Sequence, residues 1–193
     1  FVANGFDITL ADPANDFSSV GFGGADDVAI TDASGISLNA GSITGKLAVT
    51  ANATGGTGTI TDNGPLVVAG DAVFAAGTTG DVTLDAANNF NTLGVTSARN
   101  VVVNDINALA LANSTISGTL DVTTNGGISG PGAVVVAGKA TFTAGAANDI
   151  LLLNALNNFN SVGIVSGQDV ALTDRDAIDL AASTISGTLD VTS

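Results

Sequence analysis

The sequence contains no histidine, cysteine, methionine, tryptophan or tyrosine, and all 18 of its acidic residues are aspartate. Without histidine or cysteine, the chain can form neither a Ser-His-Asp nor a Cys-His catalytic arrangement, and it lacks the ligands of an ordinary zinc site. The absence of cysteine also excludes a disulfide framework and leaves the redox compartment open. The commonest catalytic and metal-binding chemistries are therefore excluded.

Positive charge is equally scarce. Four Lys and Arg residues stand against 18 Asp residues, which gives 193 residues a formal net charge of −14. A nucleic acid needs Lys and Arg to neutralise its phosphates, so we expect no nucleic-acid partner. No apolar stretch approaches the roughly 18 to 20 residues that span a bilayer, and no signal-peptide pattern opens the chain. We therefore expect no membrane insertion.

The residues that are present form a repeat. Phe1, Phe74 and Phe142 open three similar runs, FVANGFD, FAAGTTGD and FTAGAAND. Later positions keep the same spacing, since Gly70 and Gly138 lie one 68-residue unit apart. We expect a single segment over 1–193, with repeats at approximately 1–73, 74–141 and an incomplete 142–193.

The repeat extends to its last strands. The segment SITGKLAVTA (42–51) matches STISGTLDVTT (114–124) and STISGTLDVTS (183–193). The first copy carries an insertion around residues 53–57. The unit is therefore defined by the order of its motifs rather than by one tetrapeptide.

Within each copy the hydrophobic pattern has a period of two. The pairs Ile8/Leu10 and Val28/Ile30 each enclose one small or polar residue. Such alternation predicts half-buried β-strands, because successive side chains point to opposite faces. Gly, Asn and Asp separate these pairs and suit tight corners. The sequence therefore predicts an all-β protein.

The length of the unit selects the architecture. A unit of 68 residues is longer than a propeller blade of about 40 to 50 residues. It divides into about three coils, which stack in parallel at about 4.8 Å per rung. We predict an all-β, right-handed parallel β-helix (β-solenoid) with about three coils per 68-residue repeat, roughly 40 to 45 Å long. An immunoglobulin-like array is the alternative, disfavoured by the small unit and the lack of Trp and Tyr.

The repeats of this sequence resemble those of one known family. The segment FTAGAANDILLLNALNNFNSVGIVSGQDVALTDRDAIDLAASTISGTLDVTS (142–193) resembles repeats of filamentous haemagglutinin-like exoproteins and large autotransporter adhesins. The central copy is similar, from DVTLDAANNFNTLGV to GKATFTAG. The resemblance spans the chain and implies a right-handed β-helical shaft on a secreted bacterial protein with an adhesive or surface-structure role. The secretion domain of that family is not visible in this sequence.

Recurring Phe residues are candidates for a sugar-binding strip or for core filling. They form two equivalent sets, and Phe lacks the polar group that Tyr and Trp bring to recognition surfaces. We therefore expect these side chains to fill the core or its corners. The two sets are Phe1, Phe74 and Phe142, and Phe17, Phe90 and Phe159.

Recurring Asp residues at strand entries are candidates for calcium binding or for corner hydrogen bonding. A calcium ion is coordinated by six to eight oxygen ligands, whereas equivalent Asp residues lie about three rungs, roughly 14 Å, apart. We expect Asx side chains that bond their own backbone N–H groups, with calcium as the alternative. The fragment GGTGTITDNG (55–64) resembles a calcium-binding nonapeptide but has Ile60 in place of its Asp. The residues concerned are Asp7, Asp81, Asp149, Asp27, Asn100 and Asp169.

Acids that break the repeat are the candidates for catalysis. Asp174, Asp176 and Asp179 fall in one copy, and Asp26 stands beside Asp27. A β-helical glycosidase would need two carboxylates about 5 to 9.5 Å apart. No His, Glu or Tyr supplies a partner, so we expect a solvated face. The same interpretation applies to the isolated cations Lys46, Arg99, Lys139 and Arg175, and the N-glycosylation patterns at Asn52 and Asn113 are expected by chance.

We predict a non-catalytic structural shaft or fibre-forming segment at the bacterial cell surface or outside the cell. Its partners would be further copies of the same repeat, stacked end to end. The alternatives are a module that binds cell-surface glycans and, as a third reading, an enzyme acting on polysaccharides. No catalytic, cofactor or metal residue is assigned, and calcium is the only cofactor considered.

Overall fold

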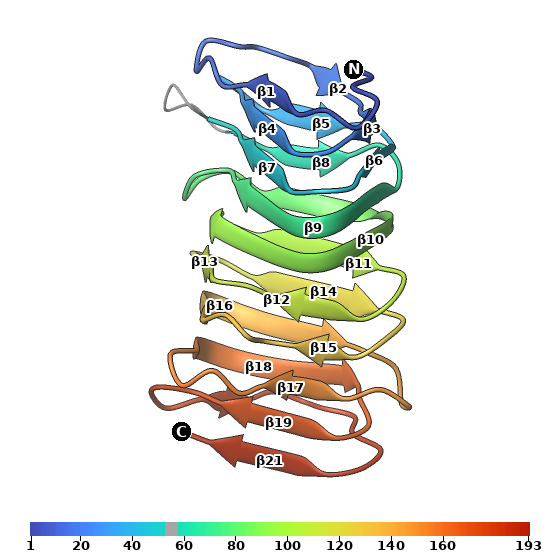
Figure 1. The fold of residues 1–193 in the computed structure, drawn as a ribbon. Helices are drawn as coiled ribbons and strands as arrows, with labels where there is room; N and C mark the ends of the chain where they lie inside the picture. The colour runs from blue at the N-terminus through green and yellow to red at the C-terminus, as the bar shows by residue number, and fades with distance from the viewer. Residues whose placement is uncertain (53–57) are drawn as a thin grey trace.

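The computed structural model describes residues 1–52 and 58–193. In this part of the chain 21 β-strands and no helix are present, so no helix could cross a membrane. The strands pair in parallel and stack as a β-solenoid of about 9 turns. Seen from the N-terminal end, the chain turns clockwise as it recedes, which is right-handed (Figure 1). The predicted fold class is confirmed.

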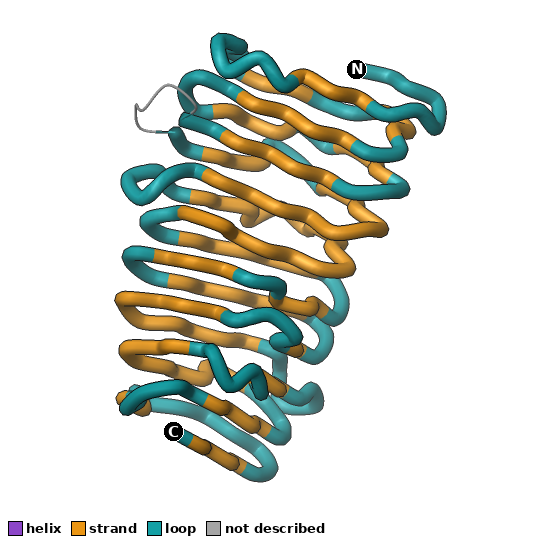
Figure 2. The backbone as a smooth tube through the Cα atoms, turned by 60° about the vertical axis from the view of Figure 1, so that its left-hand side comes forward, coloured by secondary structure: helices purple, strands orange, loops and turns teal. Residues whose placement is uncertain are grey.

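Two faces of stacked strands form the body, and Figure 2 shows them joined by loops along the edges. The first face contains β1 (Ile8–Leu10), β4 (Val28–Thr31), β7 (Leu47–Thr50), the second part of β9 (Leu66–Ala75), the second part of β10 (Val82–Ser97), β12 (Leu109–Leu111), β15 (Ile128–Ser129), β17 (Ile150–Leu152), β19 (Val170–Thr173) and β21 (Leu189–Thr192).

The second face contains β2 (Ser19–Val20), β5 (Ile36–Leu38), β8 (Ile60–Asp62), the first part of β10, β11 (Val101–Asp105), β14 (Leu120–Thr124), the second part of β16 (Val134–Thr143), most of β18 (Asn158–Ser166) and β20 (Asp179–Leu180). Short third strands bridge the faces at the edges. They are β3 (Gly23–Ala25), β6 (Gly41–Ile43), β13 (Ser114–Ile116) and the first parts of β9, β16 and β18.

Successive copies of the repeat start on opposite faces. Ile8 pairs with Val28 on the first face, whereas its counterpart Val82 pairs with Val101 on the second. The third counterpart, Ile150, is back on the first face. Each counterpart is the seventh strand segment of the two faces after the one before it, so one copy makes three and a half turns. The expected count of about three coils is thereby refined.

The core is a narrow column of Val, Ile, Leu, Ala and Phe between the faces. Phe74, Phe90, Phe142 and Phe159 are fully buried, with 0% exposure. Their rings meet edge to face, at 6.2 Å between the centroids of Phe74 and Phe90 and again at 6.2 Å between Phe142 and Phe159. This geometry is the favoured one for aromatic pairs. These four Phe residues therefore fill the core, as expected.

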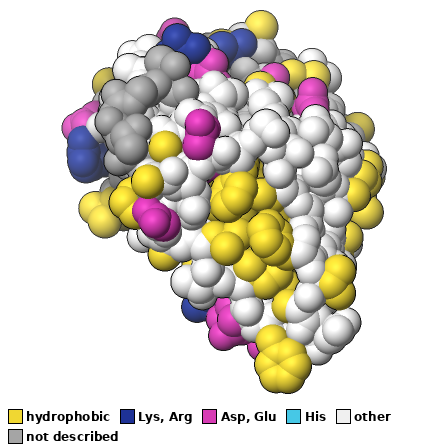
Figure 3. All heavy atoms as spheres, turned by 90° about the horizontal axis from the view of Figure 1, so that it is seen from above, with side chains coloured by type: hydrophobic (Ala, Val, Ile, Leu, Met, Phe, Trp, Pro, Cys, Tyr) yellow, Lys and Arg dark blue, Asp and Glu magenta, His cyan; other side chains and the backbone are white. Residues whose placement is uncertain are grey.

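Both ends of the stack leave part of this column uncovered. At the N-terminal end Phe1, Val2 and Phe6 are more than half exposed, and Figure 3 shows uncovered hydrophobic side chains in the middle of that end. Phe1 still packs edge to face on Phe17, with 6.4 Å between ring centroids. At the C-terminal end Leu180 is 45% exposed. Each end therefore presents apolar side chains and a free strand edge.

Candidate functional site

Polar side chains at one corner tie each turn to the next. The Oδ1 atoms of Asp27 and Asp169 accept hydrogen bonds from the backbone N–H groups of Lys46 and Thr188, at 2.7 and 2.8 Å. The Oδ1 of Asn100 accepts the corresponding bond from Thr119 at 3.0 Å. Each acceptor lies 19 residues before its donor, on the preceding turn. We call this set the Asx ladder.

Three further Asp residues extend the ladder by one turn. The Oδ1 atoms of Asp7, Asp81 and Asp149 accept hydrogen bonds from the backbone N–H groups of Asp27, Asn100 and Asp169, at 3.1 to 3.2 Å. The sequence led us to expect corner bonds to each residue's own backbone. The structure instead shows bonds to the next turn, because parallel stacking brings that amide directly beneath the side chain.

Two members of the ladder have lowered pKa values. A hydrogen bond from Arg99, whose Nη2 lies 2.6 Å from the Asp81 carboxylate, is the main cause of the lowered pKa of Asp81. Hydrogen bonds from the Thr188 backbone and hydroxyl lower the pKa of Asp169. Both carboxylates are therefore ionised at neutral pH and act as acceptors.

The calcium alternative gains no ligand cluster from the geometry. Among residues 1–52 and 58–193, no group of three or more Asp side chains is placed so that it could hold a metal ion. Within the ladder, the Asp7 carboxylate accepts its hydrogen bond from the backbone N–H of Asp27. Residues 55–57 of the nonapeptide-like fragment 55–64 lie outside the described residues.

A second repeating set of Asp residues points into the core, and the sequence analysis missed its role. Asp32, Asp105 and Asp174 are buried. One carboxylate oxygen of each accepts a 2.7 Å bond from a backbone N–H of the preceding turn, and the other accepts a 2.9 Å bond from the residue two positions later. The first donors are Phe17, Phe90 and Phe159, and the second are Ser34, Asn107 and Asp176.

Buried Asn side chains complete these corners. The amide of Asn157 donates to the backbone carbonyls of Leu152 and Thr173, both at 3.1 Å, and its Oδ1 accepts from Val134. In the preceding copy the Asn88 amide likewise donates to the Leu84 carbonyl at 3.1 Å, but its other bond goes to the Asp62 carboxylate at 2.6 Å. Asp62 has Gly130 as its counterpart, so this pair between Asp62 of the first copy and Asn88 of the second is not repeated one copy later.

Burial raises the pKa of two of these carboxyls. Desolvation is the main cause for both Asp62 and Asp105, and hydrogen bonds partly offset it, from Asn88 to Asp62 and from the Phe90 backbone to Asp105. Their surroundings contain no cation that forms an ion pair with them among the described residues. Asp62 and Asp105 therefore hold corners together by accepting hydrogen bonds rather than by charge pairing.

The three candidate catalytic acids do not form one site. Asp174 is buried and bonded to the backbone, whereas Asp176 is exposed and pairs with Arg175 at 3.1 Å. Asp179 lies exposed on β20. Asp26 is exposed and accepts a bond from the Thr44 hydroxyl at 3.1 Å. The expectation of a solvated position thus holds for Asp176 and Asp179. It is wrong for Asp174, whose buried carboxylate accepts hydrogen bonds from two backbone N–H groups.

The four cations are exposed, and three of them form ion pairs with a nearby Asp. Lys46 approaches Asp71 at 3.9 Å, both exposed, and Lys139 is exposed. The Oδ1 of Asn113 accepts a bond from the Ala133 backbone at 2.9 Å, which ties this residue to the next turn. The pattern that begins at Asn52 continues into residues outside the described part of the chain.

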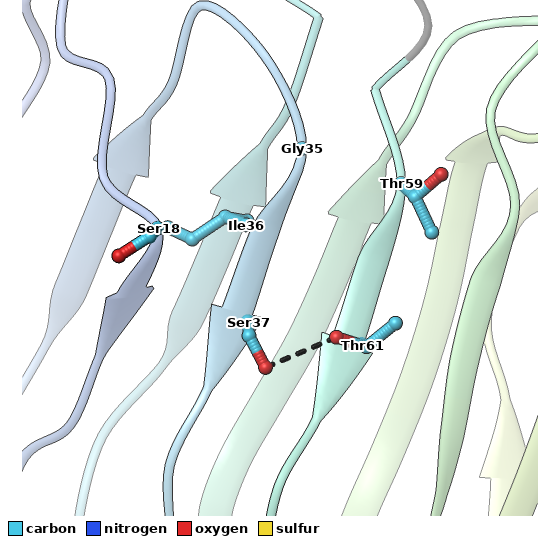
Figure 4. A pocket seen from close by; sticks show the side chains of 6 residues that line it. All are labelled: Ser18, Gly35, Ile36, Ser37, Thr59 and Thr61. Carbon is cyan, nitrogen blue, oxygen red and sulfur yellow. Dashed lines mark hydrogen bonds between the residues drawn. The ribbon is translucent and has the colours of Figure 1, made fainter.

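Two shallow hollows and one apolar patch remain. The first hollow, of about 220 Å³, is lined by Ser18, Gly35, Ile36, Ser37, Thr59 and Thr61 (Figure 4). The Thr61 hydroxyl donates a hydrogen bond to the Ser37 hydroxyl at 3.1 Å. The second, of about 400 Å³, includes Leu151 and Ser129. Leu153 and Leu156 are more than half exposed near the start of the third copy.

The comparisons with known proteins agree with a repeat. The family described as repeats of unknown function (DUF5649) matches residues 25–97, 98–166 and 167–193. No curated protein and no solved structure matches the chain.

Proposed function

This chain belongs to the DUF5649 family of repeats, and from that premise we propose that it is part of a structural shaft. The shaft would belong to a large secreted or surface-displayed bacterial protein of the filamentous haemagglutinin-like kind, and would hold an adhesive element away from the cell or build an extracellular fibre. The chain would carry out no catalysis.

One observation carries this proposal. The described residues form one parallel stack of about 9 turns, built from repeats of the same unit. Such architectures lengthen by adding units, and each unit contacts only its neighbours. The Asx ladder and the buried Asp residues bond one turn to the next, which ties neighbouring turns together along the stack.

Inserting a further copy of residues 74–141 after residue 141 tests the shaft. Three and a half additional turns at about 4.8 Å add roughly 17 Å of length. Small-angle X-ray scattering should show a maximum dimension longer by that amount with an unchanged cross-section. A second, independently tumbling body would contradict the proposal. Labelling of intact source cells with an antibody against this chain tests the surface location.

Glycan binding is the second candidate, favoured by the hydroxyl-lined hollow around Ser37 and Thr61. Hydroxyls can exchange hydrogen bonds with a sugar, although no aromatic side chain lines the hollow. Binding on a glycan array that is lost in the variant Ser37→Ala/Thr61→Val would support this role. Binding that survives the double substitution would exclude this hollow as the site.

A further inference from the structure

The second shallow hollow, of about 400 Å³, lies on the first face, where β12, β15 and β17 begin. Leu151 on β17 pairs with Ser129 on one side and Ala171 on the other, so its side chain stands between small neighbours and is 39% exposed. Small residues leave the space, and a leucine and a carboxylate border it. We call it the Leu151 hollow, and its members that matter below are Ala108, Gly127, Ser129, Asn148, Asp149 and Leu151.

The two hollows of the molecule lie at equivalent places in successive copies. Thr59 and Thr61 line the first hollow, and their counterparts 68 residues later, Gly127 and Ser129, line the Leu151 hollow. The counterpart of Leu151 in the second copy is Thr83. The same place in the repeat therefore carries hydroxyls in one case and an apolar wall in the other.

Charge differs between the copies as well. In the second copy, the Nε and Nη2 atoms of Arg99 donate hydrogen bonds to the two carboxylate oxygens of Asp81, at 2.9 and 2.6 Å. In the third copy, Asp149 is the counterpart of Asp81, and Gln168 is the counterpart of Arg99. Within residues 1–52 and 58–193, no cation pairs with the exposed Asp149, and its Oδ2 accepts no hydrogen bond.

The Arg99–Asp81 pair shows which cation this carboxylate can take. The carboxylates of Asp81 and Asp149 are held alike, because the Oδ1 of each accepts a backbone N–H of the next turn, at 3.1 and 3.2 Å. A guanidinium matches both oxygens of such a carboxylate with two parallel N–H groups. It is weakly hydrated, and its aliphatic stem packs on apolar surface. Leu151 provides that surface two residues after Asp149.

We propose that the Leu151 hollow binds an arginine side chain of another protein. The guanidinium donates two hydrogen bonds to the Asp149 carboxylate, and the aliphatic stem packs on Leu151. The amide nitrogen of Asn148 donates to the Ala144 carbonyl at 2.7 Å, which leaves its Oδ1 as a further acceptor. The net charge of −14 attracts a cationic segment toward this surface. This inference is independent of whether the chain is part of a shaft.

A blocked pentapeptide with one central arginine tests the site by NMR titration of the isotope-labelled 193-residue chain. It should shift the amide signals of residues 127–129 and 149–151 saturably. A control peptide with citrulline, which has nearly the same shape but no charge, should bind about fivefold more weakly. Equal binding by the citrulline peptide, or by a peptide with lysine in the centre, would overturn the assignment to arginine.

Variants of the chain separate the contributions of charge and apolar contact. Gln168→Arg supplies an internal guanidinium to Asp149, as Arg99 does for Asp81, and should weaken peptide binding about fivefold, as should Asp149→Asn. Leu151→Thr removes the apolar wall and should weaken binding about threefold. Gln168→Arg and Leu151→Thr install the residues of the second copy, so both fit the fold. Asp121→Asn removes the same charge from the exposed β14 position on the second face and should leave binding unchanged.

The reciprocal variant Arg99→Gln tests whether the carboxylate alone is sufficient. It frees Asp81, but Thr83 stands there in place of Leu151, so the peptide should bind at Asp81 about threefold more weakly than in the Leu151 hollow. Equal binding at the two places would show that the hollow contributes nothing and would overturn the proposal. Undiminished binding in Gln168→Arg would overturn it as well, because Asp149 would then not be the partner of the cation.

Discussion

The same ten residues, STISGTLDVT, occur at 114–123 in the middle of the stack and at 183–192 at its end. Their contacts with the preceding turn are the same. The hydroxyls of Ser114 and Ser183 each accept a 3.0 Å bond from the turn above, from Val95 and Ile164 respectively. Their exposure differs, since Val122 is fully buried and Val191 only partly.

Strand extent differs as well. Residues 114–116 form the strand β13, whereas the end copy keeps only a single bridge from Ile185 to Gly167. The sequence of a segment thus determines its bonds to the turn before it. Burial and strand length depend on the turn that follows, which supplies the second half of each strand's hydrogen bonds.

Truncating the leucine of each segment should give the largest difference in unfolding free energy between the two segments. Leu120→Ala removes side-chain atoms from a packed interior and should cost about 2 to 5 kcal/mol of unfolding free energy. Leu189→Ala acts at a half-exposed position and should cost about 0.5 kcal/mol. Urea denaturation of both variants measures the difference, and equal losses would show that the end turn is as well covered as the middle.

Removing the buried carboxylate should give the next largest effect. Asp105→Ala leaves the backbone N–H groups of Phe90 and Asn107 without acceptors, at a cost of about 1 to 3 kcal/mol each. Asp174→Ala removes the same bonds near the open end, where water can replace them, so its cost should be smaller. Thermal unfolding of the two variants tests this order, which a larger loss in Asp174→Ala would reverse.

The Asx ladder should respond alike in both segments, because it faces the preceding turn. Asn100→Ala removes the acceptor of the Thr119 amide and should cost about 1 kcal/mol. Asp169→Ala removes the acceptor of the Thr188 amide. Hydrogen exchange should accelerate at Thr119 in the first variant and at Thr188 in the second. A change confined to one of them would show that the following turn also controls the ladder.

Acid should act in opposite directions on the two regions, with the smallest effect. Asp105 has a pKa raised by burial, so its contribution to stability is full below the unfolded value near 3.8 and is lost as pH rises through the folded pKa. The pKa of Asp169 is lowered, so its contribution is lost as pH falls below that value. Unfolding free energies measured from pH 3 to 7 should no longer show the first pH dependence in Asp105→Asn. They should no longer show the second in Asp169→Asn. Unchanged profiles would contradict both assignments.

Much of the fold follows from the sequence. The period of two at Ile8 and Leu10, together with the 68-residue spacing, predicts parallel coils, and the buried rings of Phe74 and Phe142 follow from their recurrence. The extra half turn that each copy makes could not be predicted from the sequence. It depends on how many strand segments reach the two faces, and the short edge strands such as β3 and β13 look the same as face strands in the sequence.

The polar core was the harder part to predict. From sequence alone an Asp at a corner is expected at the surface, as we expected for Asp174. Its buried role can be predicted only when the backbone N–H groups that lack partners at that corner are known. The available signal was the recurrence of Asp32, Asp105 and Asp174 directly after apolar strand pairs. The exception Asp62, beside Asn88, occurs in one copy only and gives no such signal.

The alternation of copies between faces has a mechanical consequence. An irregularity that every copy shares, and that lengthens one side of the copy, tilts the axis toward the other side. In the next copy the same position lies on the opposite side, so a tilt common to all copies is reversed. Curvature cancels over each pair of copies, and an odd number of strand segments per repeat keeps a long rod straight.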